Sequence, residues 1–425
     1  MYNIKQIFQR TIFKNAMALW LVQVANYLIP IAVIPYVTRI LGVERFGDVC
    51  YAQNLVAYLA ILVNFGFDYS ATQDIANHRG DKQAVQVIYS MVMSCKFFLF
   101  ILSLFVMMIL YFILSPVQAD PVLYFWACLF NLSLVLLPSW YFQGKEQMQK
   151  LSLLNFLSKF LGAIAVFCFV KSSNHASLYL AILAVSSIVI GLVSMRWTPI
   201  FSIRAIMGNN LARKVFYKSV PVFITNLANS LYNLAGLTII GFMLTTYDVG
   251  IYAGSLKIIQ ACIMLAVMPF TVALFPRVSR LFNETPDLGW SLFRKIMLVT
   301  VCAGILMVGV IYVFAPILVR VLLGEDFIES VEQVRLMAGI PALVLWCTMI
   351  TVQGLYGLQL QRFTPWIAIL SGLVSVIINI TLIPVFFAKG SILAWYVAQF
   401  VELMLAGLLV WRYSFKSMLE TKKAR

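Results

Sequence analysis

Long apolar runs recur along the whole chain and constrain its fold more than any other feature. A helix that spans a membrane needs about 20 mostly apolar residues. Twelve stretches satisfy this criterion, at residues 15–37, 48–69, 87–113, 121–141, 151–170, 177–195, 219–243, 251–275, 294–316, 336–358, 364–387 and 391–411. Of the 425 residues, 62% are hydrophobic and 11% charged, whereas soluble domains are about half apolar and a quarter charged. The sequence therefore predicts an all-α, polytopic membrane protein with about 12 transmembrane helices.

Lysine and arginine are distributed unequally over this map. The terminal segments and the even-numbered loops hold 22 of the 31, whereas the odd-numbered loops hold six. Because cytoplasmic loops carry an excess of these residues, both termini are predicted to be cytoplasmic and the loop at 317–335 extracytoplasmic. Orientation in the membrane and contact with lipid headgroups account for the net charge of +15, so no nucleic acid partner is expected.

The segment before the first apolar run has a pattern of its own. Ile4, Ile7, Phe8 and Ile12 recur at helical spacing among basic residues. This pattern is typical of a helix that lies in the cytoplasmic interface of the membrane as an anchor. The first run is too long for a cleaved secretory signal, so we expect it to stay attached.

The sequence lacks the motifs of an enzyme or a metal site. Its only Gly-Lys pair, Gly144-Lys145, has neither the earlier glycine nor the following Ser or Thr of a phosphate-binding loop. His78 and His175 fall in loops on opposite sides of the membrane and cannot share a metal ion. The loop at 317–335 is too short for a catalytic domain. We therefore expect no enzymatic activity, no cofactor and no metal, and transport without ATP hydrolysis.

A weak internal repeat supports transport, because many transporters consist of two repeated halves. Sliding the chain by 203 residues aligns Asn26 with Asn229, and it also aligns the glycines that open the second and eighth spans. The basic segment at 196–218 is interpreted as a linker. The sequence predicts two six-helix lobes of the same orientation, at 1–205 and 206–425.

Several segments carry a family resemblance: LGVERFGDVCYAQNL (41–55), NFGFDYSATQDIA (64–76), PSWYFQGKEQMQKLSLLNFLSKF (138–160), VGIYAGSLKI (249–258), FPRVSRL (275–281), GEDF (324–327) and GLQLQR (357–362). With them the chain resembles the polysaccharide transporter branch of the multidrug/oligosaccharidyl-lipid/polysaccharide exporter superfamily, and more closely the O-antigen flippases. Lipid II flippases of this superfamily typically have fourteen spans, which counts against that member.

The resemblance implies an architecture and a substrate. The two six-helix lobes would form a V-shaped central cavity in the bacterial cytoplasmic (inner) membrane. An undecaprenyl-pyrophosphate-linked oligosaccharide would pass through it from the cytoplasmic to the periplasmic leaflet. Membrane lipids would surround the protein, and a polysaccharide polymerase and chain-length proteins would be its partners.

Such a substrate needs a hydrated groove, because every polar group stripped of water in hydrocarbon costs several kcal/mol. Polar and charged side chains inside the predicted spans are the candidates for lining it: Asp68, Lys96, Lys159, Lys257, Glu402, Asn26, Asn155, Asn226, Asn229, Asn233 and Gln260. We assign to the substrate or ion pathway Lys159, Glu402, Lys257, Lys96, Asp68, Asn26 and Asn229. A charge at the bilayer centre costs about 2.5–3.5 kcal/mol on insertion scales, so most of these charges must face protein or water.

These candidates differ in depth. Lys159 and Glu402 lie near the middle of their spans, which favours a functional role over a structural ion pair. Lys257 lies closer to an end and could snorkel to the interface. Lys96 could lie at the cytoplasmic edge of its span, and an interfacial or helix-pairing role is favoured for Asp68.

Aromatic residues near span ends have two interpretations. Trp140, Tyr141, Trp395 and Tyr396 could stack on sugar rings, but their positions favour the aromatic belt at the membrane interface.

Two rival functions remain open at this point. A cation-coupled multidrug exporter of the same superfamily would need acidic groups in its lumen, whereas intramembrane lysines here outnumber acids three to two. A membrane polymerase or ligase of lipid-linked sugars is disfavoured by the short extracytoplasmic loops.

An energy source is needed, and Glu402 is the deepest acid in the predicted spans. Burial favours the neutral form of a carboxylic acid, whereas a nearby lysine favours its charged form. Glu402 is therefore a candidate for carrying a proton in each cycle, although a permanent ion pair with Lys159 would give the same sequence.

Overall fold

The computed structural model describes the backbone of residues 2–202 and 210–423. Within its helices, side chains are described except at 2–21, 23, 27, 210–212, 231–232, 268–276, 283, 286 and 414–423. Helices make up nearly all of this part of the chain, and it contains no strand. Ten of its helical segments are long and apolar enough to cross a membrane. The predicted all-α, multi-pass membrane fold is confirmed.

The chain divides into two compact units, Met1–Asn226 and Leu227–Arg425. This division falls inside α10 (Asn210–Met243), so the first half of that helix belongs with the N-terminal unit. The predicted boundary between residues 205 and 206 lies outside the described residues and stays a prediction.

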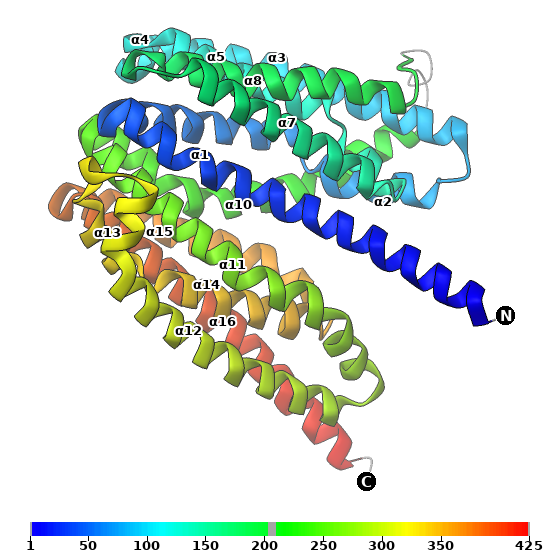
Figure 1. The fold of residues 1–425 in the computed structure, drawn as a ribbon. Coiled ribbons are helices and arrows are strands. Elements are labelled where there is room, and N and C mark those ends of the chain that lie inside the picture. Colours follow the sequence, from blue (N-terminus) through cyan, green and yellow to red (C-terminus); the bar gives the residue numbers. More distant parts are fainter. Residues whose placement is uncertain (1, 203–209, 424–425) are drawn as a thin grey trace. The chain divides into compact units, whose positions relative to one another are not determined.

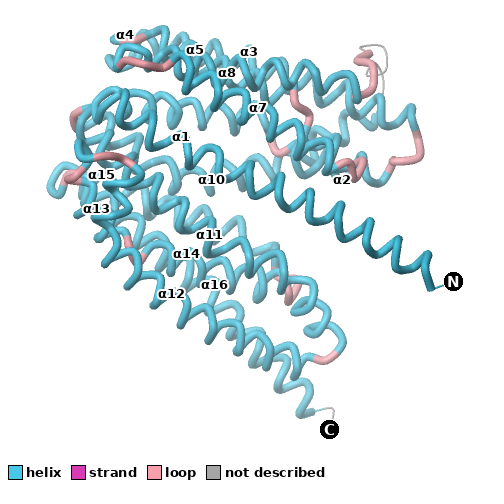
Figure 2. Tube along the Cα trace, in the orientation of Figure 1, coloured by secondary structure: helices cyan, strands magenta, loops and turns pink. Residues whose placement is uncertain are grey.

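The N-terminal unit is built from helices joined by short loops (Figures 1 and 2). Its elements are α1 (Tyr2–Asn64), α2 (Phe67–Asn77), α3 (Lys82–Ile113), α4 (Ser115–Ala119), α5 (Pro121–Leu136), α6 (Ser139–Gly144), α7 (Met148–Phe169), η1 (Ser173–His175), α8 (Ala176–Ser194), η2 (Met195–Trp197) and the first half of α10. Helix α5 packs on α8, and α7 packs on both α1 and α8.

The C-terminal unit begins with the second half of α10. It continues with α11 (Thr246–Glu284), α12 (Pro286–Leu322), η3 (Glu325–Phe327), α13 (Ser330–Met337), α14 (Ile340–Met349), the π-helix η4 (Ile350–Tyr356), η5 (Gln361–Phe363), α15 (Thr364–Phe386) and α16 (Ala388–Lys423). Helices α15 and α16 form an antiparallel pair, and α14 packs against α11, α12 and α16.

Helix α1 contains two membrane spans. The apolar segment Val24–Asn77 has 54 residues, which would extend to roughly 80 Å as one straight helix, whereas the hydrocarbon core is about 30 Å thick. The helix is interrupted at Gly42, whose φ of 71° and ψ of 176° are not helical and suit a residue without a Cβ atom. In Figure 1 the chain turns back on itself in this helix. The first two predicted spans are therefore the two arms of α1, the second continued by α2.

The other predicted spans also coincide with helices. They fall in order on α3, α5 with α6, α7, α8, α10, α11, α12, α14 with η4, α15, and α16. In α10 the apolar part is the short segment Asn233–Met243.

Large apolar side chains lie on the outside as well as in the core. Phe98 and Phe112 of α3 and Leu306 and Val313 of α12 are exposed. In a soluble protein such faces would be an aggregation hazard, but in a bilayer they contact lipid. Some polar side chains are buried inside the units, among them Asn26, Lys96, Asn379 and Gln399, and these groups bear on the candidate site.

Candidate functional site

Two neighbouring apolar spans of the N-terminal unit are interrupted along their length. The chain leaves the helix between α1 and α2 at Phe65 and Gly66, whose φ angles are 45° and 76°. It does so again between α5 and α6 at Leu137 and Pro138. Helices α2 and α6 pack against each other. Each break leaves helix carbonyl groups without their usual partners, which in a membrane must be satisfied by other groups of the protein.

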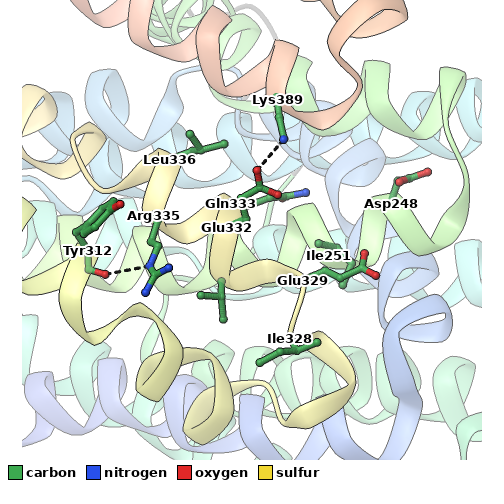
Figure 3. A pocket seen from close by; sticks show the side chains of 11 residues that line it. Asp248, Ile251, Tyr312, Ile328, Glu329, Glu332, Gln333, Arg335, Leu336 and Lys389 are labelled. Carbon is green, nitrogen blue, oxygen red and sulfur yellow. Dashed lines mark hydrogen bonds and ion pairs between the residues drawn. The ribbon is translucent and has the colours of Figure 1, made fainter.

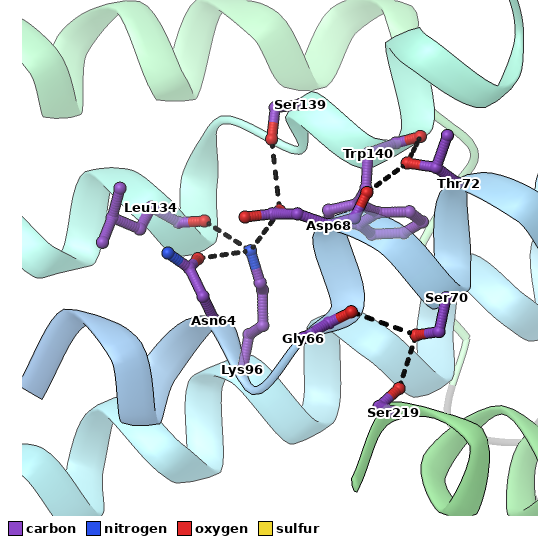
Figure 4. Close-up of polar contacts among 10 residues, drawn as sticks. All are labelled: Asn64, Gly66, Asp68, Ser70, Thr72, Lys96, Leu134, Ser139, Trp140 and Ser219. Carbon is purple, nitrogen blue, oxygen red and sulfur yellow. Dashed lines mark hydrogen bonds and ion pairs between the residues drawn. The ribbon is translucent and has the colours of Figure 1, made fainter. Parts of the chain in front are cut away.

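Lys96 of α3 donates to one such carbonyl, that of Leu134, and to side chains at the other break. Its side chain is 1% exposed, and its Nζ donates hydrogen bonds to Asn64 Oδ1 at 3.0 Å and to the Leu134 carbonyl at 3.2 Å (Figure 4). It also forms an ion pair with Asp68 Oδ1 at 3.4 Å. Asn64 and Leu134 lie in the last turns of α1 and α5, where a positive charge is favoured by the helix dipole.

Asp68 connects the two broken spans. Its Oδ1 also accepts a hydrogen bond from Ser139 Oγ at 3.3 Å, and its main-chain carbonyl accepts one from Thr72 Oγ1. The Thr72 hydroxyl lies 3.2 Å from the Trp140 carbonyl of α6 as well. The Asp68 side chain remains 45% exposed. The predicted pathway residues Lys96 and Asp68 are thus brought together, with Lys96 buried between helix ends.

The first half of α10 packs on the same break. A Cβ atom added to Gly66 would lie 2.8 Å from Val222 Cβ and 2.9 Å from the Ser219 carbonyl. Ser70 and Ser219 share a hydrogen bond of 2.5 Å, as Figure 4 shows. Lys218 forms an ion pair with Asp74 at 2.6 Å. Helix α2 is therefore held on one side by α6 and on another by α10.

Lys159 and Asn26 form a second polar contact in this unit. Lys159 of α7 is half-buried and donates a hydrogen bond from Nζ to the Asn26 carbonyl at 2.7 Å. The Asn26 side chain is 4% exposed and donates to the Ser152 carbonyl at 3.2 Å. Two predicted site residues that are far apart in sequence are thus adjacent between α1 and α7.

The remaining predicted site residues lie in the C-terminal unit. Lys257 of α11 and Glu402 of α16 are both half-buried. The Asn229 carbonyl accepts a hydrogen bond from the Asn233 side chain at 2.9 Å. Because Lys159 and Glu402 belong to different units, the ion pair considered between them stays a prediction.

Two cavities of the C-terminal unit contain polar residues that sequence reasoning missed. One, of about 600 Å³, is lined by Asp248, Glu329, Glu332, Gln333, Arg335 and Lys389 among others. Figure 3 shows the Lys389 ammonium directed at Glu332, 2.7 Å away, and Arg335 bonded to the Tyr312 carbonyl. This cavity lies beside the loop that the charge distribution predicts to be extracytoplasmic.

The other cavity, of about 230 Å³, is lined by polar residues of α10, α11 and α16. We call this cavity the amide groove, because the side-chain amides of Asn233, Gln260 and Gln399 line it together with Trp395. The other lining residues are apolar. Gln399 was not a predicted site residue. The sequence did contain a signal for it: Gln399 follows Trp395 by four residues, so the two polar side chains share one helix face.

Among the described residues, no group of three or more His, Cys, Asp or Glu side chains could hold a metal ion.

These features define a class of protein. Multiple spans, interrupted spans and polar groups within the spans are typical of membrane transporters. The fold is that of the transporters called MATE: the chain superposes with a TM-score of 0.75 on a structure described as the inward-facing conformation of a multidrug resistance MATE family transporter of the MOP superfamily. That match has 13% identity and covers 92% of this chain and 96% of the other. A eukaryotic MATE transporter, AtDTX14, gives a TM-score of 0.60 at 15% identity, covering 93% of this chain and 97% of that one.

Sequence comparison identifies the particular family. The chain belongs to the family described as polysaccharide biosynthesis protein, whose model matches residues 12–282. A curated relative in Escherichia coli strain K12, named "Putative O-antigen transporter", is 26% identical over 387 residues, covering 89% of this chain and 91% of the relative. A Shigella dysenteriae protein of the same name is 27% identical over 401 residues, covering 90% and 95%. The predicted family resemblance is confirmed.

Proposed function

We propose that this protein is a flippase that moves an undecaprenyl-pyrophosphate-linked oligosaccharide from the cytoplasmic to the periplasmic leaflet of the bacterial inner membrane. The observation that carries the proposal is the match, over about nine-tenths of the chain, to curated relatives named as O-antigen transporters. In this proposal the protein is a transporter and not an enzyme, and both of its termini are cytoplasmic.

The charges inside the spans support an anionic substrate. Lys159 is half-buried in α7 and donates a hydrogen bond to the Asn26 carbonyl at 2.7 Å. A cation at this depth attracts a diphosphate by long-range electrostatics that water screens only weakly. Lys257 adds a second half-buried cation in the C-terminal unit. Lys159 is the residue that we assign to diphosphate attraction.

The multidrug exporter alternative shares this fold, but the intramembrane charges do not favour it. A lumen that binds organic cations is expected to present carboxylates. Here Asp68 is paired with Lys96, which leaves Glu402 as the other predicted intramembrane acid. The likeness to MATE structures, at 13–15% identity, supports the fold alone.

Genetic complementation tests the function. Deleting the gene in the producing strain is expected to remove surface polysaccharide and to leave lipid-linked oligosaccharide in the cytoplasmic leaflet. Wild type restores the polysaccharide, Lys159→Arg restores part of it, and Lys159→Ala restores none although the protein inserts normally. Lys171→Ala at the end of the same helix, where Lys171 is exposed, is the matched control and restores it fully.

Two outcomes would contradict the proposal. Normal polysaccharide with Lys159→Ala would remove the role of this lysine. Normal polysaccharide after gene deletion, together with export of an organic cation such as ethidium by the purified protein, would instead support the multidrug exporter. The polymerase and chain-length proteins proposed as partners can be sought by crosslinking in the same strain.

A further inference from the structure

The amide groove contains buried polar atoms that the protein itself leaves without partners. Gln399 is 3% exposed, and its Oε1 has no hydrogen-bond partner within the described part of the chain. The same holds for Nε1 of the half-buried Trp395, which lines the same groove. A buried donor or acceptor without a partner costs about 1–3 kcal/mol, so such groups call for an explanation.

A smaller cavity adjoins the groove and extends this pattern. Asn233 and Trp395 line both cavities, and the smaller one also contains Asn379 and Ser391. Asn379 is 1% exposed; its amide N–H group bonds to the Ser375 carbonyl at 2.8 Å, while its Oδ1 has no partner among the described residues. The smaller cavity, of about 10 Å³, has room for roughly one water molecule, whereas the groove of about 230 Å³ admits a larger group.

The depth of the groove in its span restricts what its polar side chains can face. Gln399 lies eleven residues after the start of α16, which is about 16 Å along the helix and near the middle of a 30 Å hydrocarbon core. Gln260 and Asn233 at the rim are exposed. Amide side chains at this depth face protein or an aqueous path, because in lipid their hydrogen-bonding groups would be unsatisfied.

The unpaired donor and acceptor atoms indicate which chemical group can bind in the amide groove. Trp395 offers an N–H donor and Gln399, four residues later on the same helix face, offers a carbonyl acceptor. A hydroxyl group satisfies both, because it accepts from the indole and donates to the amide. A cation would be opposed by the N–H group, and a phosphate by the carbonyl oxygens. Among the residues that the structure describes, no charged side chain lines the groove.

We propose that the amide groove binds sugar hydroxyl groups of the substrate, with Trp395 Nε1 and Gln399 Oε1 as its central contacts. The inference rests on the proposed function and deepens it. It places recognition of the neutral saccharide in the C-terminal unit, apart from the attraction of the diphosphate by Lys159 in the N-terminal unit.

A comparison of two lipids tests this site. The full-length protein in nanodiscs is titrated with the sugar-bearing lipid that accumulates in the deletion strain, and separately with undecaprenyl pyrophosphate without sugar. Wild type is expected to bind the sugar-bearing lipid more tightly. Gln399→Leu and Trp395→Phe each weaken its binding about tenfold, the effect of one lost hydrogen bond, and leave binding of the bare lipid unchanged.

Control variants separate binding from folding. Trp411→Phe makes the same chemical change on the same helix at an exposed position outside the groove, and it leaves binding of both lipids unchanged. Trp395→Phe keeps an aromatic ring, so it carries the test even where Gln399→Leu fails to fold. Melting temperatures of all variants are measured without ligand.

Three results would overturn the inference. The first is equal binding of both lipids by wild type. The second is equal weakening of both lipids by Gln399→Leu and by Trp395→Phe, which marks a structural role. The third is a melting temperature raised by Gln399→Leu with sugar-lipid binding unchanged, which marks a merely hydrated groove. Failure of wild type to bind either lipid would instead overturn the proposed function.

Discussion

A lysine buried inside a membrane span needs an acceptor for each of its three N–H groups, and Lys96 has three. They come from Asn64, Asp68 and Leu134, which belong to three different helices. Two of the acceptors, the Asn64 side-chain Oδ1 and the Leu134 main-chain carbonyl, are in the last turns of broken helices. The Leu134 carbonyl is of the kind that a helix end leaves without a donor. The residue therefore compensates for the breaks that the neighbouring spans contain.

Replacing Lys96 should accordingly destabilise the N-terminal unit. We expect Lys96→Ala to lower the free energy of unfolding by about 2–4 kcal/mol, because the Leu134 carbonyl and the Asn64 and Asp68 side chains lose their donor. This loss of stability is near the lower end of the cost of breaking a buried ion pair, because the Asp68 side chain is 45% exposed and stays hydrated. Lys82→Ala, an exposed lysine at the start of the same helix, is the control and should change stability by less than about 0.5 kcal/mol. Equal unfolding curves for the two variants in detergent would contradict this account.

At the scale of helices, the positions of the spans could be predicted from the sequence, but their interruptions could not. The predicted spans at 48–69 and 121–141 run past Gly66 and Pro138, so a scan for about 20 apolar residues does not detect either break. Gly and Pro mark sites where a helix can end, yet both also occur inside transmembrane helices. Tertiary contacts from Lys96 and α10 stabilise the interrupted helices here, and such contacts cannot be seen in one sequence.

Pairing of site residues was equally hidden from the sequence. Asn26 and Lys159 were each predicted as pathway residues, but nothing in their spacing indicated that they touch. Trp395 was interpreted as part of the interfacial belt because it lies near a span end. Its place in the amide groove depends on α10, α11 and α14 packing around α16.

The break between α1 and α2 gives a prediction at this scale. Gly66→Ala should destabilise the protein by more than about 1–2 kcal/mol, because its φ of 76° disfavours a Cβ atom and that atom would lie 2.8 Å from Val222 Cβ. Gly80→Ala is the matched control, since its Cβ would meet nothing within 4 Å. Thermal unfolding of both variants measures the difference, and a Gly66→Ala variant as stable as the control would mean that the break relaxes freely.

For the whole molecule, the charge distribution predicts which side of the membrane each loop occupies. Alkaline phosphatase is active only outside the cytoplasm, so a fusion after Glu329 should be active and a fusion after Asn209 silent. Activity of both fusions, or the reverse pattern, would refute the predicted orientation and with it the direction of transport in the proposed function.

Energy supply is a further property of the whole molecule, because directional movement without ATP hydrolysis must use an ion gradient or consumption of the product. Glu402 is half-buried in α16, one turn beyond Gln399 of the amide groove. A carboxyl group that is protonated in one facing state and ionised in the other carries one proton per cycle of alternating access.

In proteoliposomes with an imposed pH gradient, wild-type flipping should follow the gradient and Glu402→Gln should flip at a rate independent of it. Glu332→Gln, an exposed acid at the other cavity, serves as the control and should keep the dependence. If wild type ignores the gradient, or Glu402→Gln still follows it, the coupling lies elsewhere, and consumption of the product on the far side becomes the driving force to test.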